Sequence, residues 1–136
     1  MAGRGSLHHL ELYVPDLERS VAFWGWLLLE LGYLLETEWD EGCAFRLANT
    51  RLVFVQAPGG PVDGPIDRRR PGLNHLAFDV ETPAEVDRLT HQLREHGVRI
   101  LYEDRHPHAG GPDHYAVFCE DPDGLKVEFV ATASET

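Results

Sequence analysis

Sulfur-containing residues are scarce in this sequence of 136 residues, which has two cysteines and one methionine. The cysteines, Cys43 and Cys119, are far apart in the chain, and no CxxC pair occurs. A thiolate zinc site and a redox-active dithiol both need clustered cysteines, so the sequence excludes both. Nothing in the sequence points to an oxidising compartment, and we expect a cytoplasmic protein.

Basic residues and long apolar runs are also few. Twelve Lys and Arg residues stand against 23 Asp and Glu residues, which gives a net charge of −11. Nucleic acids and anionic membranes attract positive surfaces, so neither is expected as the main partner. The one basic cluster, residues 68–70, lies among prolines and glycines and is typical of a solvated linker. Residues 24–29 are too short an apolar run to span a bilayer, and no signal-peptide core is seen near the start.

One pattern occurs twice and organises the sequence. Residues 73–80 align with residues 7–14, and His75 then takes the position of His9. In a strand, successive side chains point to opposite faces of the sheet. Both runs place apolar residues on one face and the histidine on the other. The two strands are therefore predicted to contribute two halves of a single site.

The first repeat, about residues 6–57, is predicted to form a strand, a helix and three strands. Apolar residues at spacings of three and four from Leu17 to Leu31 predict the helix. Asp16 is the expected N-cap, and Gly32 is the expected C-terminal glycine. The expected strands are residues 7–14, 33–39, 43–48 and 51–56.

A linker rich in glycine and proline, residues 58–71, separates this repeat from the second, about residues 72–131. Thr82 and Glu85 form an expected capping box at the start of the second helix. The expected strands of this repeat are residues 73–80, 98–102, 114–120 and 125–130. The whole sequence, residues 1–136, is thus predicted to be a single α+β domain made of two βαβββ repeats.

The last strand adds a carboxylate to the face that carries the histidines. Val127 and Phe129 are apolar and are expected to face the helix, which turns Glu128 toward the side of His9 and His75. A carboxylate on an inner face is costly unless it is paired or bound to a metal. Singly, each residue has an ordinary explanation, as a hydrogen-bonded core histidine or an edge-strand glutamate. Together they predict a divalent-metal site with open coordination positions.

These features resemble the vicinal oxygen chelate superfamily, which includes glyoxalases, bleomycin resistance proteins and extradiol dioxygenases. The resemblance spans nearly the whole chain and rests on the two repeats, on the sequence GLNHLAF around His75, and on DPDGLKVE at residues 121–128. The tight turn followed by the strand glutamate is its most specific mark. The resemblance implies an eight-stranded half-open barrel with a metal inside its concave sheet, and commonly a homodimer.

Carried over to this sequence, the resemblance implies that His9, His75 and Glu128 bind one divalent ion: Fe, Mn, Co, Ni or Zn. Glyoxalase I takes a fourth ligand from the last strand of the first repeat, where we expect Phe54 and Gln56 to face the cavity. Gln56 could offer its amide oxygen. Neither residue is the glutamate of the bacterial glyoxalases, which argues against a lactoylglutathione lyase.

Further residues are expected around this metal. His114 and Tyr115 begin the seventh strand, one of them must point inward, and either could carry protons beside Glu128. The side chains expected to meet a substrate are Arg46, Phe54, Tyr102 and His106. The histidines expected to lie outside the site are His8, His91 and His96.

The resemblance therefore implies a divalent-metal-dependent enzyme acting on a small substrate that chelates the metal through vicinal oxygens. The metal would act as a Lewis acid, in a lyase or isomerase reaction or in a dioxygenase reaction. The alternative is a metal-free ligand-sequestering protein of the bleomycin-resistance type, since net acidity suits a cationic ligand. A third possibility is a superfamily member that retains the site without activity.

Overall fold

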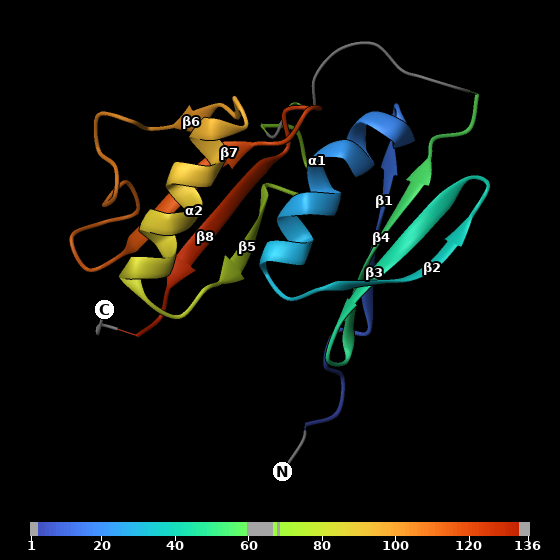
Figure 1. The fold of residues 1–136 in the computed structure, drawn as a ribbon, viewed down its shortest axis with the longest axis horizontal. Coiled ribbons are helices and arrows are strands. Elements are labelled where there is room, and N and C mark those ends of the chain that lie inside the picture. Colours follow the sequence, from blue (N-terminus) through green and yellow to red (C-terminus); the bar gives the residue numbers. More distant parts are fainter. Residues whose placement is uncertain (1–2, 60–66, 68, 134–136) are drawn as a thin grey trace. The chain divides into compact units, whose positions relative to one another are not determined.

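The computed structural model describes residues 3–59, 67 and 69–133. The chain divides into two compact units, residues 1–64 and 65–136 (Figure 1). Within the described residues, each unit contains one helix and one four-stranded sheet, in the order strand, helix, three strands. The predicted α+β class and the two βαβββ repeats are thus confirmed. Most of the predicted linker, residues 58–71, lies outside the described residues.

The first unit contains one helix and four strands: β1 (His9–Val14), α1 (Leu17–Glu30), β2 (Leu34–Trp39), β3 (Gly42–Leu47) and β4 (Thr50–Gln56). Its sheet has the order β1-β4-β3-β2, with β1 parallel to β4 and the other pairs antiparallel. The predicted cap is confirmed, because the Asp16 carboxylate accepts a hydrogen bond from the amide of Arg19. Gly32 follows the helix with a φ of 96°, a conformation that glycine adopts readily.

The core of the first unit lies between α1 and one face of its sheet. Trp24, Leu27 and Leu28 on α1 have no solvent exposure. The Trp24 ring packs against Phe54 of β4, with 5.4 Å between ring centroids. Phe54 is also fully buried, so the two aromatic rings fix the helix against the sheet.

The second unit repeats this plan: β5 (His75–Asp79), α2 (Pro83–Glu95), β6 (Ile100–Leu101), β7 (Tyr115–Glu120) and β8 (Lys126–Ala131), with the sheet order β5-β8-β7-β6. Thr82 caps α2 by accepting a hydrogen bond from the amide of Glu85, as predicted. Strand β6 is shorter than the predicted strand at 98–102. The amide of Val98 donates to Leu93 at the helix exit, and Tyr102 leaves the extended conformation with a φ of 56°.

The turn between β7 and β8 sets the register of the second sheet. One oxygen of the Asp121 carboxylate accepts hydrogen bonds from the amides of Asp123 and Leu125, each at 2.9 Å. In the resulting register Glu128 lies opposite Phe118. Because side chains alternate along a strand, this register decides that Glu128 lies on the face away from α2.

No helix among the described residues is long and apolar enough to cross a membrane.

The position of Phe54 gives a stability prediction. Phe54→Ala removes a fully buried ring from beneath Trp24, and we expect a loss of about 3–5 kcal/mol in the free energy of unfolding. Phe54→Leu, which keeps most of the apolar volume, should cost about 1–2 kcal/mol. Chemical denaturation measures both. Wild-type stability in Phe54→Ala would contradict the assignment of this ring to the core.

Candidate metal centre

A buried carboxylate in the second unit contacts two imidazoles. Glu128, in the middle of β8, is 5% exposed. Its Oε1 lies 3.0 Å from Nε2 of His75. Its other oxygen, Oε2, contacts Nε2 of His114. A buried carboxylate is stable only when its charge is balanced or its oxygens are hydrogen-bonded, and these two rings supply both possibilities.

Strand pairing brings the three groups together. Strands β5 and β8 are parallel, with Ala77 opposite Glu128, so His75 lies on the same face two residues away. His114 directly precedes β7 and reaches the same carboxylate. Its ring lies against Gly110, where an added Cβ would overlap the imidazole. Residue 110 must therefore be glycine for His114 to keep this position.

Asn74 orients the His75 ring. The Asn74 Oδ1 lies 2.6 Å from Nδ1 of His75 and can only accept a hydrogen bond, so Nδ1 carries a proton. In the neutral ring this leaves a lone pair on Nε2, facing the carboxylate of Glu128. This orientation leaves Nε2 available to a metal ion on the side of Glu128.

The donor set fits a divalent metal. Two imidazole nitrogens and one carboxylate are ligands that Zn, Mn, Fe, Co and Ni accept. Here Glu128 contacts both imidazoles directly. In the part of the chain that the structure describes, no group of three His, Cys, Asp or Glu residues is arranged to hold a metal ion as it stands. Metal binding would replace the hydrogen bond between His75 and Glu128 with bonds from both side chains to the ion.

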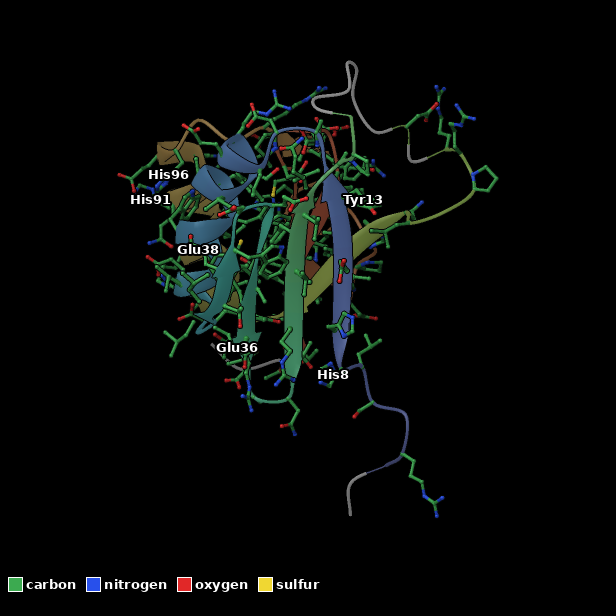
Figure 2. The ribbon with its side chains drawn as sticks, turned by 90° about the vertical axis from the view of Figure 1, so that its right-hand side faces the viewer. His8, Tyr13, Glu36, Glu38, His91 and His96 are labelled. Carbon is green, nitrogen blue, oxygen red and sulfur yellow. The ribbon has the colours of Figure 1, made fainter. Side chains whose placement is uncertain are left out.

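His9 belongs to the first unit, at the start of β1. It is exposed, on the strand face opposite to Leu10 and Leu12, as the alternation predicted. Its Nδ1 lies 3.0 Å from Nδ1 of His8, the neighbouring residue labelled in Figure 2. The role of His9 as a metal ligand stays a prediction.

The orientation predicted for Phe54 and Gln56 is wrong. The side chain of Gln56 accepts from the amide of Leu17 at 2.9 Å and donates to the carbonyl of Pro15 at 2.8 Å, so it fastens the start of α1. Phe54 packs beneath the same helix. By register, the β4 residue equivalent to Glu128 is Val53, which lies opposite Glu11. Strand β4 is buried on both faces at its centre, so its sequence carries no alternation from which its facing could be predicted.

His114 and Tyr115 are neighbours in the sequence but contact different partners. His114 points to Glu128, whereas the hydroxyl of Tyr115 donates to Asp87 on α2 at 2.6 Å. This hydrogen bond, together with burial, raises the pKa of Tyr115 to about 12. Tyr115 therefore stays protonated near neutral pH and lies on the helix face. The expectation that Tyr115 could carry protons beside Glu128 is wrong.

The predicted substrate residues are divided between the two units, with Arg46 and Phe54 in the first and Tyr102 and His106 in the second. Arg46 forms a 3.1 Å ion pair with Glu36 in the first unit (Glu36 is labelled in Figure 2). The pKa of His106 is lowered, mainly by burial and then by the positive charge of Arg94 on α2. His106 is therefore close to this helix. Tyr102 does lie near the carboxylate face, because its ring is 5.5 Å from that of Phe118. His91 is exposed on α2 and His96 is exposed at the C-cap of this helix, as predicted (Figure 2).

Two residues of this face were missed by the sequence analysis. Phe118 lies beside both imidazoles, with ring centroids 6.2 Å from His75 and 6.4 Å from His114. Lys126, the only lysine in the sequence, is opposite His75 in the register. The alternation that turned Glu128 inward also turns Lys126 inward, because the two are separated by one residue.

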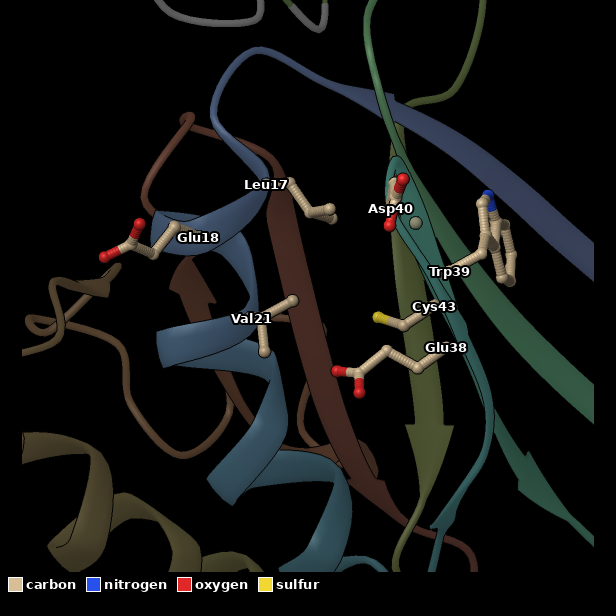
Figure 3. Close-up of a pocket in the computed structure, with 8 residues that line it drawn as sticks. Leu17, Glu18, Val21, Glu38, Trp39, Asp40 and Cys43 are labelled. Carbon is tan, nitrogen blue, oxygen red and sulfur yellow. The ribbon is translucent and has the colours of Figure 1, made fainter.

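A separate hollow of about 470 Å³ lies in the first unit, between the start of α1 and the β2–β3 hairpin (Figure 3). It contains none of the predicted ligands. Its lining consists of Leu17, Glu18, Val21, Glu38, Trp39, Asp40, Gly42 and Cys43. Burial raises the pKa of the Cys43 thiol, so it is not a ready nucleophile. Three carboxylates beside apolar groups suit a cationic ligand.

The chain is similar to proteins of known sequence and structure along nearly its whole length. YqjT, an uncharacterized protein of Bacillus subtilis, is 53% identical over 125 residues, covering 92% of this chain and 98% of its own. The glutathione transferase FosA of Serratia marcescens is 29% identical, over 90% of this chain and 78% of its own. A crystal structure from Bacillus halodurans, described only as a candidate glyoxalase, has 54% identity and a TM-score of 0.90, with 94% and 96% of the two chains covered.

The family model for the Glyoxalase/Bleomycin resistance protein/Dioxygenase superfamily matches residues 6–129, which include both units and all three predicted ligands. Two βαβββ units of identical strand order are consistent with this match. The chain belongs to the Glyoxalase/Bleomycin resistance protein/Dioxygenase superfamily.

Proposed function

We propose that this protein is a divalent-metal-dependent enzyme that acts on a small substrate with two neighbouring oxygen atoms. The observation that carries the proposal is the buried carboxylate of Glu128, held by the imidazoles of His75 and His114. His75, Glu128 and, from the first unit, His9 would hold the ion. When bound, the ion supplies Lewis acidity at the substrate oxygens.

The remaining side chains have separate tasks in this proposal. Asn74 keeps the lone pair of His75 Nε2 directed at the ion through its 2.6 Å hydrogen bond to Nδ1. With Glu128 holding the ion, Nε2 of His114 would be available to accept or deliver a proton at the substrate. Phe118 provides an apolar wall beside both rings and keeps water from one side of the site.

The reaction type follows less directly from the residues. FosA, a superfamily relative, is named as a glutathione transferase, and the wider family also includes lyases and dioxygenases. Position 53, equivalent to that of Glu128, is valine, so the first repeat supplies no second carboxylate there. We therefore favour activation of the substrate by a single carboxylate and histidines, and disfavour a lactoylglutathione lyase with two glutamate ligands.

Metal binding tests the proposal directly. We expect wild-type protein purified without chelator to bind about one equivalent of Mn, Co, Ni or Zn, measured by calorimetry and elemental analysis. Glu128→Gln should weaken this binding by at least about 100-fold, because the amide cannot balance the charge of the ion. Glu95→Gln, an exposed change on α2, is the matched control and should bind like wild type. Wild-type affinity in Glu128→Gln would refute the proposed centre.

Two single substitutions distinguish the roles of His114 and Tyr115. We expect His114→Gln to lower the turnover of a substrate found by screening by about 100-fold or more, since general acid–base groups typically contribute this much. Tyr115→Phe should leave turnover within about twofold and change the free energy of unfolding by less than about 1.5 kcal/mol, because its hydroxyl serves a bond to α2. The reverse order of effects would show that Tyr115 is the group in contact with the substrate.

A second function is favoured by the acidic hollow of the first unit. A sequestering protein would hold a cationic ligand between Glu38, Asp40 and Trp39 without using a metal. We expect that the protein does not have this sequestering function, and a binding experiment tests this. Bleomycin titrated in the presence of EDTA should give no saturable quenching of tryptophan fluorescence. Micromolar binding that Glu38→Gln and Asp40→Asn weaken would instead favour the sequestering function.

A further inference from the structure

Lys126 is unusual in its surroundings. It lies on β8, two residues before Glu128 and on the same face, opposite His75 of β5. Two residues along a strand span about 6.6 Å. The only lysine of the sequence is therefore half-buried next to the predicted metal ligands.

The ammonium of Lys126 is held by aromatic groups. Its Nζ donates to the hydroxyl of Tyr102 at 3.1 Å. It also lies 5.1 Å from the ring centroid of Tyr102 and 5.2 Å from that of Phe118. Among the residues that the structure describes, no carboxylate forms an ion pair with Lys126. An ammonium has three donor hydrogens, and the Tyr102 hydroxyl accepts one of them.

The other unit provides an internal comparison. Arg51 has the position in β4 that Lys126 has in β8, because it lies opposite His9. The guanidinium of Arg51 is neutralised by Glu36 at 3.1 Å. In a chain with a net charge of −11, a partly buried cation can readily acquire a carboxylate partner, as Arg51 does. Among the described residues, the equivalent cation of the second unit, Lys126, forms no ion pair with a carboxylate and contacts Tyr102 and Phe118 instead.

A second cation borders the same ring. The guanidinium carbon of Arg105 lies 5.0 Å from the centroid of Tyr102. The amide of Arg105 donates to the carbonyl of Tyr102 at 3.0 Å, in a turn that brings the arginine back over the ring. Tyr102 itself has a φ of 56°, which is rare for a bulky residue. The loop thus holds the tyrosine between an exposed guanidinium and a half-buried ammonium.

We propose that Lys126, with the hydroxyl of Tyr102 and the guanidinium of Arg105, binds an anionic group of the substrate. This deepens the proposed function, on which it rests for the chelating end of the molecule, whereas the anion subsite itself needs no metal. The substrate class is a small molecule with two chelating oxygens and a carboxylate or phosphoryl group a few atoms away. Leu101, Ala116 and Phe118 form an apolar floor on this face, which suits a short hydrocarbon link between the two ends.

Two hydroxamates that differ in one group test the subsite in zinc-loaded protein. Butyrohydroxamate offers only the chelating oxygens, and the monohydroxamate of succinate adds a carboxylate. Calorimetry should show that wild type binds the carboxylated compound about tenfold more tightly, as expected for one charge-assisted hydrogen bond. Lys126→Met should abolish this preference and Lys126→Arg should keep it. Arg88→Met, an exposed change on α2 of the same unit, is the control and should behave as wild type.

A second experiment, without metal, observes the ammonium group of Lys126 alone. Protein labelled with ¹³C at Cε of lysine gives one side-chain signal, because Lys126 is the only lysine. In the presence of EDTA and at constant ionic strength, inorganic phosphate should shift this signal saturably, whereas chloride should not. Arg105→Met should raise the phosphate concentration needed for half-saturation severalfold.

The two arms separate this inference from the proposed function. Equal affinity of wild type for the two hydroxamates, or a preference that Lys126→Met retains, overturns the anion subsite and leaves the metal site standing. If neither hydroxamate binds, the metal proposal fails and the phosphate titration decides. A saturable shift of the Lys126 signal then supports the subsite, and an unmoved signal overturns it.

Discussion

Burial of one negative charge is the constraint on which the second unit depends. Glu128 lies in the centre of a strand whose neighbours Val127 and Phe129 are fully buried, and it is 5% exposed itself. A carboxylate in such a place destabilises the fold unless cations or donors surround it. Here the balance comes from two histidines that approach from β5 and from the loop before β7. Two of the groups in this balance, Glu128 and His75, are also proposed metal ligands.

The fold could be predicted because the informative strands are apolar on one face only. In β1 the alternation of exposed and covered residues is visible in the sequence, and it placed His9 correctly relative to Leu10 and Leu12. The same alternation placed Glu128 on the side of His75. Helix starts at Asp16 and Thr82 could be predicted because a capping side chain binds its own backbone and needs no tertiary partner.

The site could be predicted only in part, and the errors have physical causes. Strand β4 is buried on both faces at its centre, so neither Phe54 nor Gln56 carried a signal of its facing. Two loop residues also shape the site, and loops have no periodic pattern from which their roles could be predicted. Asn74 orients the imidazole of His75, and Gly110 leaves space for that of His114. The position of Tyr102 depends on a backbone conformation that few residues adopt, and no pattern in the sequence marks it.

The turn that ends at Gly124 has a consequence for how this protein can change by mutation. The carboxylate of Asp121 fixes the length of the connection, and the strand after it has a repeat of two residues. A single inserted or deleted residue there would exchange the two faces of β8. Glu128 and Lys126 would be driven against α2, and Val127 and Phe129 would be presented in their place. Substitutions can therefore change this site gradually, whereas insertion or deletion of one codon in the turn would remove it in a single step.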